Sequence, residues 1–269
     1  MPLGFAVGAF GTLVGAGGGF VLVPILLLIY PDEEPATITA ISLFVVFANA
    51  CSGTLAYARQ RRIDYRSGAW FAVATLPGAV AGAIVVGYIP RQLFDAIFAI
   101  TLTALGAFLI LRSDRQAIQP PVTGRGVVHR LLRDRYGNTF SYGFQLWKGV
   151  LLAGVIGFLS SLLGIGGGVI HVPAMTTVLH FPMHVATATS QFVLAFMAAE
   201  GSAVHVANGN LSPDNGLWRA VLLAIGAIPG AQVGALIARR VHSSVISRAL
   251  AVSLVIVGAR LGLKALGVA

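Results

Sequence analysis

Two glycine clusters have the composition and spacing of backbone binding sites. Residues 17–19 are three consecutive glycines inside an apolar run over 3–30, and residues 166–168 are three more inside an apolar run over 146–179. Three glycines in a row destabilise a helix by about 1 kcal/mol each relative to alanine. Backbone that leaves a helix within hydrocarbon must be buried in protein or line a cavity. We therefore predict a helix break at each cluster, followed by a half-helix whose free N–H groups and positive dipole end can bind an oxyanion.

Polar side chains in the two apolar runs that follow the glycine-containing runs could add hydrogen-bond donors to this site. Ser42 and Asn49 lie in one run, and Ser190 and Gln191 lie in another. For a single serine, a hydrogen bond between two helices is the more common role. An amide is costly to bury without partners, so Asn49 and Gln191 are the better candidates for residues that line a cavity.

Two ionisable side chains are candidates for proton transfer. Glu200 is the only carboxylate in the interior of an apolar run, and an ionisable residue at such a position is a functional hypothesis by default. His171 lies within the second glycine motif, where it could relay a proton or donate to a substrate. A histidine that packs between helices and bonds a carbonyl explains His171 equally well.

The predicted site is thus made of uncharged backbone and polar side chains, with no catalytic residue. The predicted substrate-binding residues are Gly17, Gly18, Gly19, Gly166, Gly167, Gly168, Ser42, Asn49, Ser190, Gln191 and His171, and the proton-coupling candidates are Glu200 and His171. Neither glycine cluster is followed by Gly-Lys-Ser/Thr, which excludes a P-loop. The histidines lack a compact ligand spacing, so we predict no metal site and no cofactor.

The elements that hold this site must be membrane helices. Of the 269 residues, 57% are hydrophobic and 10% are charged, whereas soluble domains carry about 25% charged residues. The composition predicts an all-α, polytopic membrane protein with about seven or eight spans. Its apolar runs cover residues 3–30, 36–58, 68–89, 92–111, 146–179, 185–207, 216–238 and 243–263.

The charge distribution sets the orientation. The chain has 18 Lys+Arg against 9 Asp+Glu, a net charge of +9. In so apolar a chain this excess indicates Arg-rich cytoplasmic loops rather than nucleic-acid binding. Arg59, Arg61, Arg62 and Arg66 place the loop after the second run in the cytoplasm, together with a basic segment over 112–145.

The chain is an internal duplication. Gly15-Ala16-Gly17-Gly18-Gly19 with Pro24 matches Gly164-Ile165-Gly166-Gly167-Gly168 with Pro173, and Pro77-Gly78-Ala79 matches Pro229-Gly230-Ala231. We divide it into a first transmembrane repeat (1–111), a basic cytoplasmic linker (112–145) and a second transmembrane repeat (146–269). The basic residues fit parallel and inverted repeats equally well, whereas the excess length of the run over 146–179 favours inverted repeats with re-entrant helices. Interrupted segments at matching positions of two repeats point to a transporter with its site between them.

Two copies of Gly-x-Gly-Gly-Gly-x-x-x-x-Pro, each with a later Pro-Gly-Ala, resemble the sulfite exporter TauE/SafE family over nearly the whole chain. The resemblance implies a multi-pass protein of the cytoplasmic (inner) membrane that carries small sulfur oxyanions or organosulfonates, such as sulfite or sulfoacetate. It does not fix the substrate.

We therefore expect a secondary transporter that exports such an anion, with proton coupling as a further hypothesis. An anion channel or facilitator on the same fold, and a non-catalytic membrane assembly subunit, are the alternatives. An enzyme is not expected, because no nucleophile–base pair or metal cluster is visible. The partners implied are the small anion and the lipid bilayer, with no nucleic acid, and Gly-x-x-x-Gly pairs such as Gly78/Gly82 leave a homodimer open.

Overall fold

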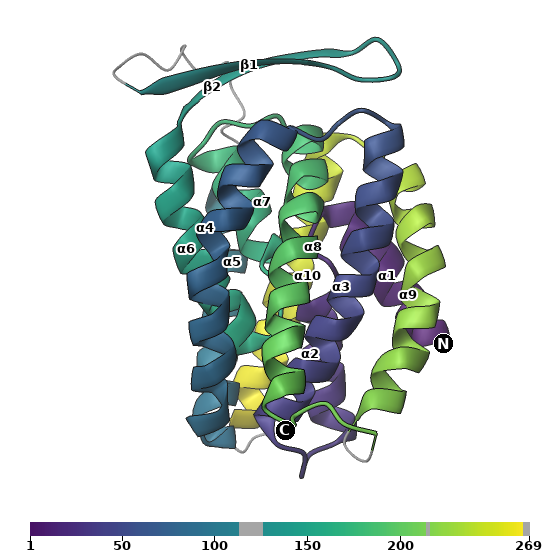
Figure 1. The fold of residues 1–269 in the computed structure, drawn as a ribbon, viewed down its shortest axis with the longest axis vertical. Helices are drawn as coiled ribbons and strands as arrows, with labels where there is room; N and C mark the ends of the chain where they lie inside the picture. Colours follow the sequence, from purple (N-terminus) through teal and green to yellow (C-terminus); the bar gives the residue numbers. More distant parts are fainter. Residues whose placement is uncertain (113–125, 214–215, 266–269) are drawn as a thin grey trace.

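The computed structural model describes residues 1–112, 126–213 and 216–265, which form a bundle of ten α-helices with one β-hairpin across its end (Figure 1). The prediction of an all-α membrane protein is confirmed for this part of the chain. The helices are α1 (Pro2–Val14), α2 (Gly19–Ile29), α3 (Pro35–Arg59), α4 (Tyr65–Val85), α5 (Arg91–Arg112), α6 (Leu146–Leu163), α7 (Gly168–Thr177), α8 (Met183–Ala207), α9 (Leu217–Ala238) and α10 (Ser243–Ala265), with a 3-10 turn η1 (Val86–Tyr88).

Five of these helices are long and apolar enough to cross a bilayer, namely α3, α4 with η1, α5, α6 and α9. Large aromatic side chains are exposed at the two ends of the bundle, as in the aromatic belts of membrane proteins. Trp70 and Trp147 lie at the end near the β-hairpin, and Tyr88 and Trp218 lie at the opposite end. The many exposed leucines, isoleucines and valines between these belts face the space that lipid fills.

The glycines of the Gly-x-x-x-Gly pairs allow helices of the same chain to approach closely. A Cβ on Gly78 or Gly82 of α4 would collide with backbone of α6, and one on Gly230 or Gly234 of α9 would collide with backbone of α1. α1 packs along α9, and α4 packs along α6. These pairs therefore serve packing within the chain, as short side chains do between membrane helices.

Equivalent helices of the two halves run in opposite directions. In the α3–α8 pair, Leu43 faces Gly201 while Gly53 faces Gln191, so the two helices are antiparallel. In the α5–α10 pair, Gly106 faces Val255 while Thr103 faces Gly258, so these are antiparallel as well. Such contacts favour inverted over parallel repeats. The inverted arrangement remains a prediction.

The helices before and after the second glycine cluster enter and leave at the same end of the bundle. α6 begins directly after the second strand of the β-hairpin, and α7 leads to Phe181. The ring of Phe181 packs on those of Tyr142 and Phe144 in that strand, with centroid distances of 4.5 and 4.8 Å. α6 and α7 therefore form a re-entrant pair whose turn lies within the bundle.

The helices around the first cluster form a second re-entrant pair from the opposite end. The carbonyl of Leu27 in α2 accepts a hydrogen bond from Arg91 at the start of α5 (3.0 Å). Tyr30, just after α2, lies under the guanidinium of Arg219 near the start of α9, 4.1 Å from the ring centroid. Figure 1 shows α7 near the β-hairpin end of the bundle and α2 near the other end.

The described part of the linker folds into a β-hairpin, for which the sequence analysis predicts no structure. Strand β1 (Val127–Arg133) pairs antiparallel with β2 (Thr139–Gln145). Alternation of Phe140, Tyr142 and Phe144 with small or polar residues is the signal for β2, since successive strand residues face opposite sides. The remainder of the linker, residues 113–125, lies outside the described residues.

Candidate transport site

The two glycine clusters form the turns of the two re-entrant pairs. We call residues 15–18 the first tip and residues 164–167 the second tip. Gly15 caps the end of α1 and Gly164 caps the end of α6, both with left-handed backbone (φ 76° and 67°). Positive φ recurs within each tip, for example at Gly18 (87°) and Gly166 (78°). Glycine is needed here because L-residues with a Cβ rarely adopt this conformation.

The two tips touch each other at the centre of the protein. A Cβ on Gly19, the first residue of α2, would lie 2.6 Å from the carbonyl oxygen of Gly164. A Cβ on Gly168, the first residue of α7, would collide with the carbonyl oxygen of Gly15. The start of α2 is therefore covered by the backbone that follows α6, and the start of α7 is covered by the backbone that follows α1. The predicted break residues of the two repeats thus lie in contact.

Two equivalent serines tie the tips together crosswise. Ser42 of α3 donates to the carbonyl of Gly164 (2.7 Å), so a first-repeat hydroxyl holds the second tip. Ser190 of α8 donates to the carbonyl of Gly15 (3.1 Å), so a second-repeat hydroxyl holds the first tip. Both serines are fully buried. The two hydrogen bonds are equivalent, since in each a serine of one repeat donates to the tip of the other.

The amide side chains that the sequence singles out also contact the first tip or the helix before it. Asn49 donates to the carbonyl of Gly17 (3.2 Å) and accepts from the hydroxyl of Thr12 (3.1 Å). Gln191 donates to the carbonyl of Gly11 (3.4 Å), while its own buried oxygen has no partner among the described residues. Asn49 therefore contacts the first tip, whereas Gln191 contacts the helix before it.

The second tip carries two buried hydroxyls that the sequence analysis did not select. Ser160 and Ser161 end α6, are fully buried, and have no hydrogen-bond partner among the described residues. A Cβ on Gly167 would lie 3.0 Å from the hydroxyl oxygen of Ser160. The signal in the sequence is the repeat itself, because Thr12 and Ser161 each precede the first glycine of their motif by three residues.

The two tips differ in the side chain at the position of Asn49. Asn49 contacts the first tip, whereas Met197 occupies the equivalent position of α8 and faces Gly167 of the second tip. The first tip is thus closed by an amide, while the second is lined by a thioether and by hydroxyls without partners. Among the described residues, the unpartnered hydroxyls of Ser160 and Ser161 lie beside the second tip, whereas the unpartnered oxygen of Gln191 lies beside the helix before the first tip.

His171 lies one turn into α7, to the side of the tip contact. It is buried, with its ring 6.0 Å from that of Phe71 in α4. Its Nδ1 atom has no partner within the described residues. The packing on Phe71 agrees with a helix-packing histidine, and the unpartnered nitrogen leaves room for a proton relay.

Glu200 lies ten residues after Ser190 on α8, which corresponds to about 15 Å along a helix at 1.5 Å per residue. Its side chain is partly buried, and its Oε2 has no partner among the described residues. The next residue, Gly201, faces the hydroxyl of Ser161 at the end of α6. Glu200 is therefore separate from the tip contact but next to the side of the second tip where partners are missing.

Comparison with known proteins identifies the family of this chain. A family model described as "Sulfite exporter TauE/SafE" matches residues 1–261. The chain belongs to the TauE/SafE family. "Probable membrane transporter protein YunE" of Bacillus subtilis is 33% identical over 265 residues, covering 96% of this chain and 94% of that protein.

Two more distant relatives carry the same description. The "probable membrane transporter protein" MJ0441 of Methanocaldococcus jannaschii is 28% identical over 74% of this chain and 68% of its own length. YfcA of Escherichia coli, described in the same words, is 21% identical over 82% and 73%. No solved structure matches the chain. The protein is thus a multi-pass membrane transporter and not an enzyme.

Proposed function

We propose that this TauE/SafE transporter exports sulfite or a related small sulfur oxyanion or organosulfonate across the cytoplasmic membrane, as a secondary carrier. The observation that supports the proposal most directly is the meeting of the two tips, with Ser42 and Ser190 bonded crosswise between the repeats. Discontinuous helices that meet between repeats form the substrate sites of several secondary transporters.

The groups at the tips can bind an anion without a positively charged side chain. The first N–H groups of a helix have no partner within that helix and carry the positive end of its dipole. α2 and α7 both begin at the tips, and serine hydroxyls lie beside them. Two helix starts with hydroxyl donors match the oxygen atoms of a sulfite or sulfonate group.

The conformation described here is closed at the tips, since each helix start is covered by carbonyl backbone of the other repeat. Binding therefore requires the tips to separate. Separation breaks the bonds from Ser42 and Ser190 to Gly164 and Gly15, which frees the two hydroxyls to donate to the anion. Ser160 and Ser161 can donate at the same time, because they have no partner in the described residues.

The same closure favours a carrier over a channel. A channel needs a continuous open path, whereas backbone contact between the tips interrupts any path along their interface. Movement of one repeat against the other would expose the site to one side at a time. Steady, non-saturating conductance in a planar bilayer would instead support the channel.

Proton coupling is a second part of the proposal and rests on Glu200 and His171. His171 is buried and Glu200 is partly buried, and each has a buried atom without a partner among the described residues. If protons drive export, Glu200→Gln and His171→Ala will flatten the pH dependence of anion flux in proteoliposomes. An unchanged pH profile in both variants would remove these residues from the coupling mechanism.

The direct test measures the uptake and efflux of sulfite, thiosulfate, sulfoacetate and taurine in proteoliposomes. Saturable flux of at least one is expected, with Ser42→Ala and Ser190→Ala each lowering it. Ser253→Ala is the matched control, since its hydroxyl bonds only the carbonyl of Leu250 in the same helix. Absence of saturable flux for all four compounds would contradict the proposed substrate class.

A further inference from the structure

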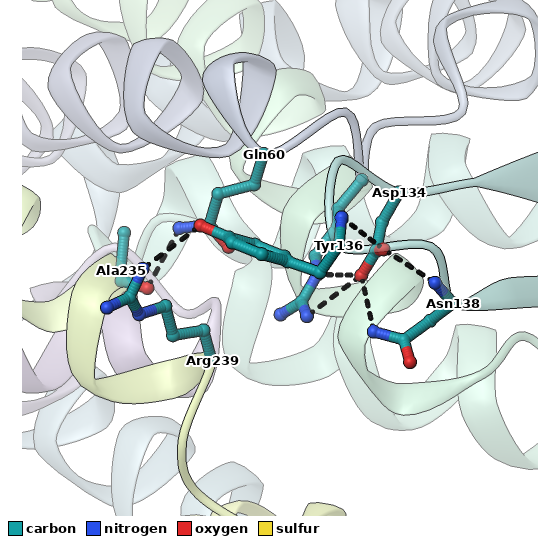
Figure 2. A network of polar contacts seen from close by, with 7 residues as sticks. Gln60, Asp134, Tyr136, Asn138, Ala235 and Arg239 are labelled. Atoms are coloured by element: carbon teal, nitrogen blue, oxygen red, sulfur yellow. Dashed lines mark hydrogen bonds and ion pairs between the residues drawn. The ribbon is translucent and has the colours of Figure 1, made fainter.

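The tip of the β-hairpin is fastened to the ends of two membrane helices (Figure 2). Buried Arg62 donates to Asp134 through Nε (3.2 Å) and Nη2 (3.1 Å). The backbone N–H of Arg135 donates to the carbonyl of Gln60 (3.0 Å), and the Gln60 side chain donates to the carbonyl of Ala235 in α9 (3.0 Å). The ends of α3 and α9 and the hairpin tip are therefore held in one arrangement.

Four arginines from these elements line a cavity beside this network. Arg59 and Arg61 come from the end of α3 and the turn after it, and Arg133 and Arg135 come from the β-hairpin. The cavity has a volume of about 690 Å³ and is open to solvent. All four residues are exposed, and none of their side chains makes a hydrogen bond or ion pair with a residue in the described part of the chain.

The carboxylate in the cavity wall does not neutralise these arginines. Oδ2 of Asp134 accepts from Arg62 and from the side chain of Asn138. Oδ1 accepts from the backbone N–H groups of Tyr136 and Asn138. Asp134 is thus paired with Arg62, and the four arginines that line the cavity have no counter-charge from the described residues.

Topology alone does not account for this convergence. The preference for basic residues in cytoplasmic loops raises their number but does not gather them around one cavity. A guanidinium presents parallel N–H donors that match the oxygens of a phosphate group. Exposed Tyr65 and Trp70, shortly after Arg61 and Arg62, mark the level of the lipid headgroups, where anionic lipids attract basic residues.

We propose that this cavity binds a phosphate-bearing anion that bridges Arg59 and Arg61 to Arg133 and Arg135. The phosphate belongs either to the headgroup of an anionic lipid or to a soluble phosphate compound. The site lies at the cytoplasmic end of the protein and is independent of the proposed transport of sulfur oxyanions. Its occupation would strengthen the attachment of the β-hairpin to α3.

The test compares binding to the purified full-length protein in detergent. The probes are inorganic pyrophosphate, phosphatidylglycerol at fixed mole fraction in mixed micelles, and phosphatidylcholine as the neutral lipid, read by thermal shift and native mass spectrometry. The pocket variant is Arg133→Gln/Arg135→Gln. The matched control is Arg66→Gln/Arg248→Gln, which removes the same charge from exposed positions that do not line the cavity.

We expect saturable binding of at least one phosphate probe, weakened at least tenfold in the pocket variant and unchanged in the control. Binding of phosphatidylglycerol alone identifies a lipid site, and binding of pyrophosphate as well identifies a site open to soluble phosphate. Equal binding by both variants overturns the proposal, as does the absence of saturable binding of both phosphate probes. The ligand-free pocket variant should unfold at the wild-type temperature, because its arginines make no contact that the substitution would remove.

Discussion

The glycines at the tips meet one of two physical demands. Gly17 and Gly167 have left-handed backbone, which a side chain would strain (φ 71° and 65°). Gly19 and Gly168 have ordinary backbone but no space, because a Cβ would meet the opposite tip. Substitution of Gly19 or Gly168 therefore tests the contact between the repeats without straining the backbone.

We predict that Gly19→Ala and Gly168→Ala each lower the melting temperature and the anion flux. The added Cβ must displace backbone of the other repeat, and overpacking of a tight contact costs about 1–3 kcal/mol. Gly87→Ala is the control, since a Cβ there meets nothing within 4 Å. Thermal unfolding in detergent and proteoliposome flux measure both effects. Wild-type values for Gly19→Ala and Gly168→Ala would show that the tips do not touch as described.

Substitution of Ser160 or Ser161 should not lower the melting temperature, in contrast to the glycine substitutions. The two hydroxyls are buried without partners in the described residues, so Ser→Ala at either position removes an unsatisfied polar group. We expect a melting temperature equal to or above that of the wild type without substrate, because an unpaired buried hydroxyl is unfavourable. If these hydroxyls bind the anion, the Kd for it rises about tenfold. Unchanged affinity would exclude them from the site.

The residues of the site were partly predictable because the duplication marks them twice. Glycine in triplicate at matching positions indicates a break, and Ser42 and Ser190 stand out as equivalents. Ser160 was less visible, since a serine at the end of an apolar run is common. That each serine bonds the other repeat's tip depends on how segments more than a hundred residues apart pack together, which a single sequence does not specify.

At the scale of elements, the β-hairpin connects helix ends from both halves. Asp64 caps α4, accepts from the hydroxyl of Tyr142 (2.9 Å) and donates its backbone N–H to Thr189 of α8 (3.0 Å). Burial, together with the nearby charge of Asp64, raises the pKa of Tyr142, so its hydroxyl remains a donor. The described part of the linker is thus a structural element, in addition to the topology signal that its charge provides.

The pairing of Arg62 with Asp134 predicts how the attachment of the hairpin depends on pH. Burial of Asp134 acts to raise its pKa, but hydrogen bonds from Asn138, Arg62 and Tyr136 outweigh it and hold the pKa below its ordinary value. A lowered folded-state pKa means that the stabilisation is fully present above the unfolded pKa of about 3.9. It is lost as the pH falls through the lower, folded value.

Asp134→Asn should therefore destabilise the protein at neutral pH by roughly 3–5 kcal/mol, because Arg62 is left buried without its counter-charge. The difference in melting temperature from the wild type should stay constant between pH 7 and 5 and shrink towards pH 3. Asp32→Asn, at an exposed position, is the control. A difference that already shrinks between pH 7 and 5 would contradict the lowered pKa.

At the scale of the whole molecule, the two ends of the bundle are closed by different contacts. At the β-hairpin end, Arg62 binds Asp134 of the linker. At the opposite end, Glu33 in the loop before α3 binds Arg219 of α9 at 2.6 Å, which connects the first repeat to the second. Antiparallel equivalents such as α3 and α8 make the two ends comparable. We therefore expect motion between the repeats to open one end while the other stays closed.

A cross-link between the repeats at the end opposite the β-hairpin tests this motion. In a Cys51→Ala background, Glu33→Cys and Arg219→Cys would be joined by a short bis-methanethiosulfonate reagent, since Cys51 is the single native cysteine. Because Glu33 and Arg219 must separate when that end opens, we expect the cross-link to lower anion flux at least tenfold and dithiothreitol to restore it. Either single-cysteine variant treated in the same way should keep its flux. Full flux through completely cross-linked protein would mean that transport does not separate these two segments, and the moving parts would then have to lie within one repeat.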